Sequence, residues 1–74
     1  MDKDTKSQFT KELGELFAKY NINYIDKMEY ERNENVTEYV KIFYDGGENF
    51  KKINVTLDSL KGMVVDIVKQ GGLD

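Results

Sequence analysis

One stretch, from Val36 to Tyr44, limits the possible folds more than any other part of the chain. β-Branched and aromatic residues dominate it, and turn-forming residues lie on both sides, which is typical of a β-strand. Alternation divides its side chains into two faces. The apolar face, interrupted by Glu38, is expected to meet the core, and its other members are Val36, Val40, Ile42 and Tyr44. The opposite face carries two aromatic rings that a purely solvated face does not need, and its members are Thr37, Tyr39, Lys41 and Phe43.

Two further runs with strand-like composition flank this stretch. Residues 22–32 predict the first strand, and a β-bulge near Ile25 and Asp26 would turn the Asp26 side chain outward. Residues 50–57 predict the third strand. The side chains expected to point inward from these two strands are Ile22, Tyr24, Met28, Tyr30, Ile53, Val55 and Leu57.

The loops between these runs are short, so neighbouring strands are expected to pair as antiparallel hairpins. Asp45-Gly46-Gly47 is a strong hairpin signal, because residues of these types tolerate positive φ. Residues 32–35 lack the Asn-Gly signature, so the type of the first turn stays open.

The N-terminal part of the chain predicts an amphipathic helix. Thr5 and Gln8 form a capping box, so the helix is expected to be capped by Thr5 or Ser7, and residues 1–4 are expected to fray. Gly14 weakens the helix and would allow it to approach the sheet closely. The apolar stripe of this helix is Phe9, Leu13, Leu16, Phe17 and Tyr20.

A second helix is predicted near the C-terminus, capped by Thr56 or Asp58 and ended by Gly71-Gly72. Its core stripe is Leu60, Met63, Val64 and Ile67. The predicted fold class is therefore α+β, in the order α-β-β-β-α, as one domain over residues 1–74. We expect a three-stranded antiparallel meander with both helices packed on one face, which leaves the other face of the sheet open.

Composition excludes several functions. The chain has no cysteine and no histidine, which removes disulfides and Cys or His metal ligands, and we expect no cofactor. No apolar run reaches the ~20 residues of a membrane span, and the polar N-terminus is no signal peptide, so a cytoplasmic protein without a membrane partner is expected. A formal charge of -3 argues against non-specific nucleic-acid binding.

The C-terminal stretch Lys61-Gly-Met-Val-Val-Asp-Ile-Val-Lys-Gln-Gly-Gly-Leu73 resembles the last helix of HicA-type toxins. That family commonly ends in Lys-Gly, an Ile five residues after the glycine, then Lys-Gln-x-Gly and an apolar residue. The resemblance implies the α-β-β-β-α order of double-stranded-RNA-binding domains, mRNA cleavage and a partner antitoxin. The local match covers about thirteen residues, and the topology covers the whole chain.

This chain departs from the family at its catalytic centre. HicA-type cleavage depends on a histidine early in the sheet, and no histidine is present here. The resemblance therefore implies at most an RNA-binding protein without nuclease activity. The entry to the last helix, residues 56–61, carries one lysine where double-stranded-RNA-binding domains are lysine-rich. The lysines that such a function would use are Lys27, Lys41, Lys52 and Lys61.

The open sheet face is the first candidate binding site. Its aromatic and basic residues suit a protein partner, including a second copy, or a stacking platform for single-stranded nucleic acid, and an ordinary solvated face would look similar. The site residues predicted on this face are Tyr39, Lys41, Phe43, Phe50 and Lys52. The full set of residues expected there also includes Ile25, Lys27, Glu29, Glu31, Thr37, Asn54 and Thr56.

The first hairpin is the second candidate. Its carboxylates would imitate the spacing of nucleic-acid phosphates, as in small acidic inhibitors of phages and mobile elements, or they are an ordinary charged surface. The residues concerned are Glu29, Glu31, Glu34 and Glu38. The acidic residues show no spacing typical of a metal loop or an acid–base pair. We therefore expect a small non-catalytic interaction protein that binds and regulates or inhibits a macromolecule, with a protein partner ahead of RNA.

Overall fold

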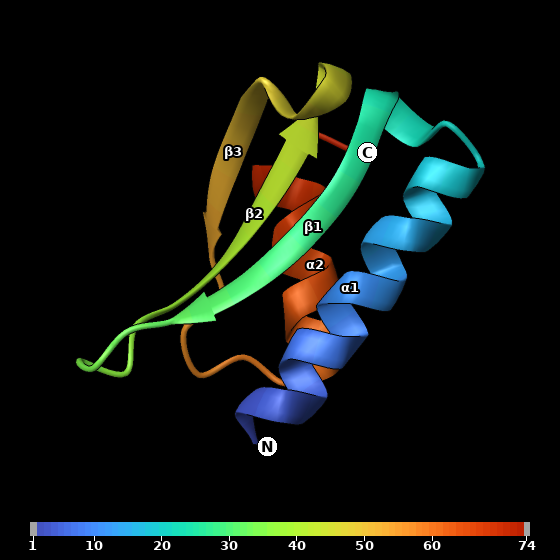
Figure 1. Ribbon diagram of the computed structural model, residues 1–74. Coiled ribbons are helices and arrows are strands. Elements are labelled where there is room, and N and C mark those ends of the chain that lie inside the picture. Colours follow the sequence, from blue (N-terminus) through green and yellow to red (C-terminus); the bar gives the residue numbers. More distant parts are fainter. Residues whose placement is uncertain (1, 74) are drawn as a thin grey trace.

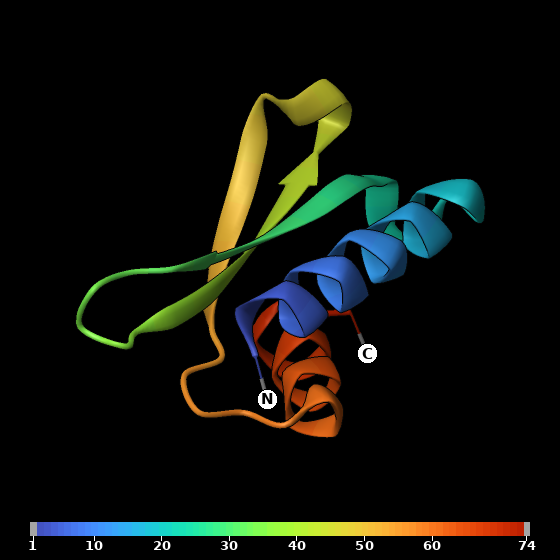
Figure 2. The ribbon, with the colours of Figure 1, turned by 60° about the horizontal axis from the view of Figure 1, so that its bottom comes forward.

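The computed structural model describes residues 2–73 and confirms the predicted α-β-β-β-α order (Figure 1). The three strands form one antiparallel sheet in the order β1-β2-β3. Both helices lie on the same side of this sheet, which leaves its other face uncovered among the described residues (Figure 2). The elements are α1 (Lys3–Lys19), a 3-10 turn η1 (Ile22–Tyr24), β1 (Ile25–Arg32), β2 (Glu38–Tyr44), a 3-10 turn η2 (Asp45–Gly47), β3 (Asn49–Asn54) and α2 (Leu60–Gln70).

The predicted helix caps are wrong. Asp2 caps α1 in place of Thr5 or Ser7, and Ser59 caps α2 in place of Thr56 or Asp58. The Asp2 carboxylate accepts a hydrogen bond from the Thr5 N–H at 2.7 Å, so α1 begins at Lys3 and includes Lys3 and Asp4, which we expected to fray. Met1 lies outside the described residues. The Ser59 hydroxyl caps α2 by accepting from the Gly62 N–H at 3.1 Å. Several neighbouring Ser, Thr and Asp residues are equally suited to capping, and only the helix's packing selects one.

The predicted β-bulge is confirmed, with a consequence that the alternation did not show. The register between β1 and β2 shifts between Ile25 and Lys27, and Asp26 is exposed. Because the bulge adds one residue, Ile25 points into the core with 3% exposure, and its predicted place on the open face is wrong.

The ends of the three strands were predicted too long. Residues 22–24 form η1 instead of strand, since Asn23 and Tyr24 have φ of 52° and 60°, and Tyr24 is 80% exposed. Val36 and Leu57, predicted inward, are exposed and have φ of 59° and 62°. Left-handed residues break the alternation of a strand, so side chains beyond them no longer follow its faces.

The core lies between the sheet and the two helices. Gly14 of α1 makes the closest approach, because a Cβ built there would lie 2.5 Å from the Met28 nitrogen of β1. The close packing predicted for this glycine is confirmed. The buried apolar side chains are Ile25, Met28, Val40, Ile42, Ile53, Val55, Met63 and Ile67.

Candidate protein-interaction surface

The strand register gathers the predicted aromatic and basic residues on the face of the sheet away from the helices. Between β2 and β3, Lys41 lies opposite Lys52 and Phe43 lies opposite Phe50. All five predicted site residues, Tyr39, Lys41, Phe43, Phe50 and Lys52, are therefore neighbours on one surface. We call this surface the open face, and its members are Lys27, Glu29, Glu31, Tyr39, Lys41, Phe43, Phe50, Lys52 and Asn54.

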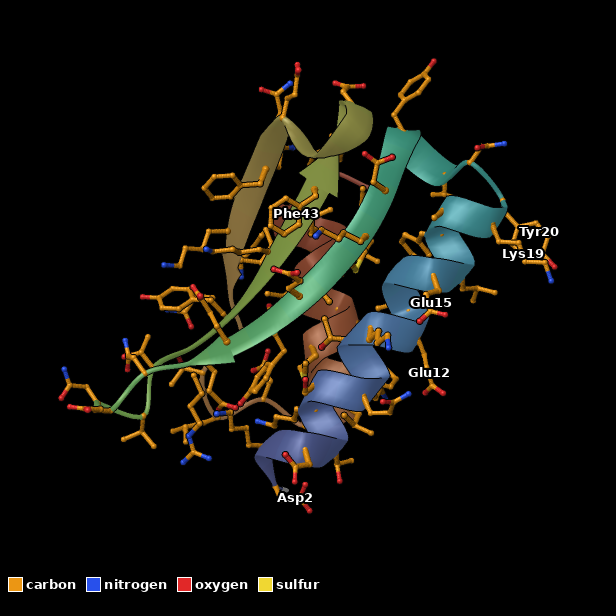
Figure 3. All side chains as sticks on the ribbon, viewed as in Figure 1. Asp2, Glu12, Glu15, Lys19, Tyr20 and Phe43 are labelled. Atoms are coloured by element: carbon orange, nitrogen blue, oxygen red, sulfur yellow. The ribbon has the colours of Figure 1, made fainter. Side chains whose placement is uncertain are left out.

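Aromatic rings form the middle of the open face. The Phe43 and Phe50 rings pair across the strands with their centroids 5.8 Å apart and their planes tilted by 38°. Figure 3 labels Phe43 on β2, where its ring stands beside β3. Phe50 is 55% exposed, while Phe43 and Tyr39 are half-buried by their neighbours. Such a ring pair stabilises a sheet, and it also presents apolar surface to solvent.

Each ring of the open face lies beneath a lysine. The Lys27 ammonium lies 4.9 Å from the centroid of Phe43, and that of Lys41 lies 5.4 Å from the centroid of Phe50. Lys52 lies 4.3 Å from the centroid of Tyr39. These distances are within the range of cation–π attraction, which holds the ammonium groups over apolar surface.

Two glutamates hold these lysines in place. Glu31 lies 3.1 Å from Lys52 and 3.7 Å from Lys41, measured between carboxylate oxygen and Nζ. The hydrogen bond from Lys52 lowers the pKa of Glu31. Glu29 pairs with Lys27 at 3.3 Å. Since these pairs are exposed to solvent, each contributes little to stability. Together they leave the open face with only a small excess of positive charge.

The four glutamates predicted to form an acidic surface on the first hairpin lie in three different environments. Glu29 and Glu31 lie on the open face and pair with lysines. Glu34 is exposed in the loop between β1 and β2. Glu38 is only 4% exposed and points to the helix side of the sheet. The four carboxylates therefore do not form one acidic surface, because alternation along β1 and β2 sends them to opposite faces.

Glu38 instead belongs to a buried polar cluster that sequence reasoning missed. Its Oε2 accepts hydrogen bonds from the Lys6 ammonium at 2.8 Å and from the Tyr30 hydroxyl, and its Oε1 accepts from the Leu57 N–H at 2.8 Å. Burial would raise the pKa of Glu38, but these three donors outweigh it and lower the pKa to about 2. Burial and the bond to Glu38 raise the pKa of Tyr30 to about 12. In the sequence, this buried role was indicated by the position of Glu38, which interrupts an otherwise apolar strand face.

A second pair of carboxyl groups lies beside α2. Burial and a hydrogen bond with Asp66 raise the pKa of Asp58 to about 6. Oδ2 of Asp58 is buried without a hydrogen-bond partner among the described residues. In residues 2–73, no group of three or more acidic side chains is arranged to hold a metal ion. The raised pKa means that the charged form of Asp58 is disfavoured in the folded protein.

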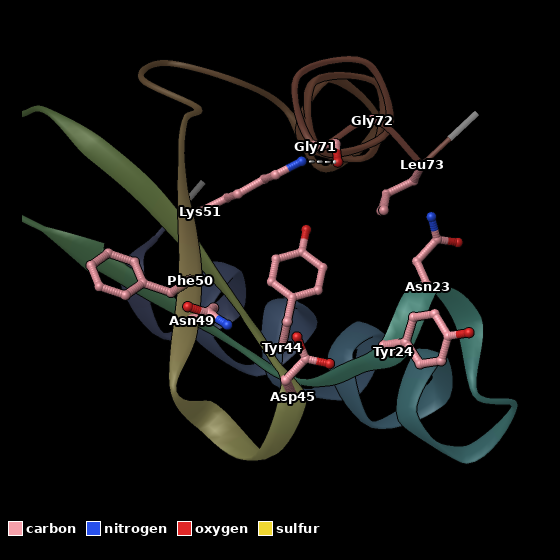
Figure 4. Close-up of a pocket in the computed structure, with 10 residues that line it drawn as sticks. All are labelled: Asn23, Tyr24, Tyr44, Asp45, Asn49, Phe50, Lys51, Gly71, Gly72 and Leu73. Carbon is pink, nitrogen blue, oxygen red and sulfur yellow. Dashed lines mark hydrogen bonds between the residues drawn. The ribbon is translucent and has the colours of Figure 1, made fainter.

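A hollow of about 330 Å³ lies at the end of the sheet where β3 begins (Figure 4). Tyr24, Phe50 and Leu73 contribute apolar surface to it. The only ammonium on its wall, that of Lys51, donates to the Gly71 carbonyl at 3.0 Å, so its charge is already directed at the end of α2. The hydroxyl of Tyr44 is buried without a partner among the described residues. The Lys51 ammonium lies 5.8 Å from the centroid of the Tyr44 ring, so these two side chains share one wall of the hollow.

Comparison with known proteins supplies no family for this chain. This chain matches no protein-family model, no curated protein and no solved structure. The part of the chain from residue 2 to residue 73 contains no helix that is long and apolar enough to cross a membrane.

Proposed function

We propose that this protein is a non-catalytic interaction module that binds a protein partner through the open face. The observation that carries the proposal is the set of three aromatic rings, Tyr39, Phe43 and Phe50, gathered on a face that no described element covers. Aromatic side chains are enriched among the residues that contribute most to protein–protein binding. A partner that covers Phe50 would remove from water a ring that is now 55% exposed.

The charges around the rings support a protein partner over nucleic acid. Lys27, Lys41 and Lys52 surround the aromatic centre, and Glu29 and Glu31 alternate with them. A mixed polar rim around an apolar centre is typical of protein interfaces. The two glutamates would repel a phosphate backbone, and the carboxylate–lysine pairs reduce the counterion release that drives nucleic-acid binding.

Binding of single-stranded RNA is the second candidate, in line with a HicA-like protein without nuclease activity. The lysines that lie over the rings favour it, because ssRNA sites combine stacking rings with cations. The same lysines already occupy the ring faces on which bases would stack. Lys61 lies on α2, on the other side of the sheet, so it cannot act with the open face. The RNA function therefore ranks below the protein function.

A binding surface without catalysis would act by covering part of the partner's surface. We propose that binding regulates or inhibits the partner, in a cytoplasmic setting that suits a chain without cysteine. We propose a phage or another mobile element as its setting, on the basis of its small size and acidic composition.

The proposal is tested by site-directed photocrosslinking in lysate of the native host. A benzophenone amino acid at Phe50 should attach one discrete protein in nuclease-treated lysate, and the double variant Tyr39→Ala/Phe43→Ala should abolish that product while remaining folded by circular dichroism. The matched control is the same amino acid at Tyr20, which is 63% exposed at the end of α1, away from the open face. Products that disappear on nuclease treatment would establish the RNA function instead, and an unchanged product with the double variant would reject the open face.

A further inference from the structure

The two edges of the sheet are protected to different degrees. At the β1 edge, α1 runs alongside the strand, and Gly14 brings the helix backbone against Met28 (Figure 1). At the β3 edge, no described element flanks the strand in either view (Figures 1 and 2). Five of the six residues of β3 are exposed. An uncovered edge strand is a template for pairing with a further strand.

The hydrogen-bond pattern shows which backbone groups of β3 point outward. The Val55 N–H donates to the Glu38 carbonyl at 2.9 Å, at the point where the β2–β3 ladder ends. Hydrogen-bonded and non-bonded pairs alternate along an antiparallel ladder, so Ile53 and Lys51 also bond toward β2. The N–H and C=O groups of Phe50 and Lys52 therefore point away from the sheet. Outside the ladder, the described residues offer these groups no hydrogen-bond partner.

The charge of β3 limits what can pair with it. Lys51 and Lys52 are its only charged residues, whereas β1 carries three acidic residues and the whole chain has a net charge of -3. Edge lysines oppose self-pairing, because two β3 strands side by side would bring their lysines together. An acidic side chain on the open face would instead meet the Lys52 ammonium, whereas Lys51 lies on the helix side and donates to the Gly71 carbonyl. The side chain of Lys52 remains 47% exposed although it pairs with Glu31.

We propose that β3 accepts an extended acidic segment of the protein partner as a fourth strand of the sheet. The added strand would bond to the outward backbone groups of Phe50 and Lys52. Because Lys52 and Phe50 share the open face, a carboxylate of the added strand would lie beside Lys52 and an apolar side chain two residues along would lie beside the exposed Phe50 ring. This inference rests on the proposed function and adds the chemistry of the partner, an extended segment that combines acidic and apolar residues.

The test uses backbone N-methylation, which chemical synthesis of a chain of 74 residues allows. N-methyl-Lys52 loses the outward N–H but keeps the side chain and all bonds to β2. The control is N-methyl-Arg32, since the same alternation turns the Arg32 N–H outward at the β1 edge. The probes are two short fluorescein-labelled peptides with threonine at every second position, so that the residues between the threonines share one face. Glutamate and valine take turns at those positions in one peptide, and lysine and valine do so in the other. Circular dichroism establishes that both N-methylated proteins fold.

The glutamate–valine peptide should bind the unmodified protein at least about tenfold more tightly than the lysine–valine peptide, by fluorescence anisotropy. N-methyl-Lys52 should lose this binding and N-methyl-Arg32 should keep it, while Lys52→Gln should reduce the preference for the glutamate–valine peptide.

Equal binding of both peptides, no binding of either, or binding that survives in N-methyl-Lys52 would overturn the proposal. Concentration-dependent self-association that N-methyl-Lys52 abolishes would also overturn it, in favour of a second copy at this edge. If N-methyl-Lys52 still forms the crosslink at Phe50, the open face remains the site and only the strand addition fails.

Discussion

Lys6 and Glu38 form a salt bridge of 2.8 Å between Nζ and Oε2, although 32 residues separate them in the chain. Their side chains are 6% and 5% exposed, so the ion pair is buried. It ties the first turns of α1 to the start of β2, and the bond from the Leu57 N–H ties the β3–α2 loop to the same carboxylate. The Tyr30 hydroxyl of β1 also donates to Glu38, so four separate segments of the chain meet at one carboxylate.

Removing the lysine of this pair should be strongly destabilising. Lys6→Met leaves Glu38 ionised and buried with two neutral donors, so we expect a loss of about 3–5 kcal/mol in the free energy of unfolding, measured in urea. The double variant Lys6→Met/Glu38→Leu should recover much of that loss, because no buried charge remains unpaired. A Lys6→Met protein as stable as the original would show that water or another group satisfies Glu38.

Stability should pass through a maximum on the acid side of neutrality. The pKa of Asp58 in the folded state, about 6, lies above its ordinary value of 3.8, so the folded protein gains stability as the pH falls from 6 toward 4. The pKa of Glu38, about 2, lies below its ordinary value of 4.5, so its contribution is lost as the pH falls below 4.5. The groups that face Asp58 are Asp66 of α2, Lys6 of α1 and Glu38 of β2.

Asp58→Asn separates the two effects. At pH 7 this variant should be more stable than the original by on the order of 1–2 kcal/mol, and it should no longer gain stability between pH 6 and 4. The loss below pH 4.5 should remain. The control is Asp26→Asn at the exposed bulge, which should keep the full profile. If the stability of Asp58→Asn depends on pH in the same way as that of the original protein, the gain in stability between pH 6 and 4 comes from another group.

Replacement of Gly14 by alanine should destabilise the protein despite alanine's higher helix propensity. Propensity favours alanine by about 1 kcal/mol, but the new Cβ would lie 2.5 Å from the Met28 nitrogen and would push α1 away from β1. We expect a net loss of about 1–3 kcal/mol by urea unfolding. Gly62→Ala is the matched control in α2, where the nearest atom, Cγ of Asp58, is 3.3 Å away and belongs to a side chain. Equal effects at the two positions would contradict the close approach of α1.

Leu57 should be replaceable by glycine with a gain in stability. Its side chain is 83% exposed and its φ is 62°, a conformation that costs an ordinary residue about 1–2 kcal/mol. Leu57→Gly removes this cost and keeps the N–H that donates to Glu38, so a gain of roughly 0.5–1 kcal/mol is expected in thermal or urea unfolding. Leu57→Ile keeps the apolar side chain and adds β-branching, and it should lose stability. A loss for both variants would mean that the leucine side chain itself contributes to packing.

Local sequence patterns determined the elements and most of the core of this protein. Alternation in residues 36–44 identified the central strand, and a spacing of three to four residues identified both helices, because each pattern depends only on neighbours in the chain. The same alternation placed Tyr39, Phe43 and Phe50 on one face, and the register of β2 and β3 brings them together there. The bulge at Asp26 was also visible as an interruption of an apolar face.

Only the tertiary structure decided which polar groups are buried and where the strands end. Lys6 belongs to a helix with many other charged residues, and nothing near it in the chain shows that Glu38 will be its partner. Likewise, the inward turn of Ile25 and the left-handed φ of Val36 and Leu57 depend on how separate segments meet. A buried charge is stable only beside its partner, and a partner 32 residues away in sequence becomes a neighbour only when the helix packs on the sheet.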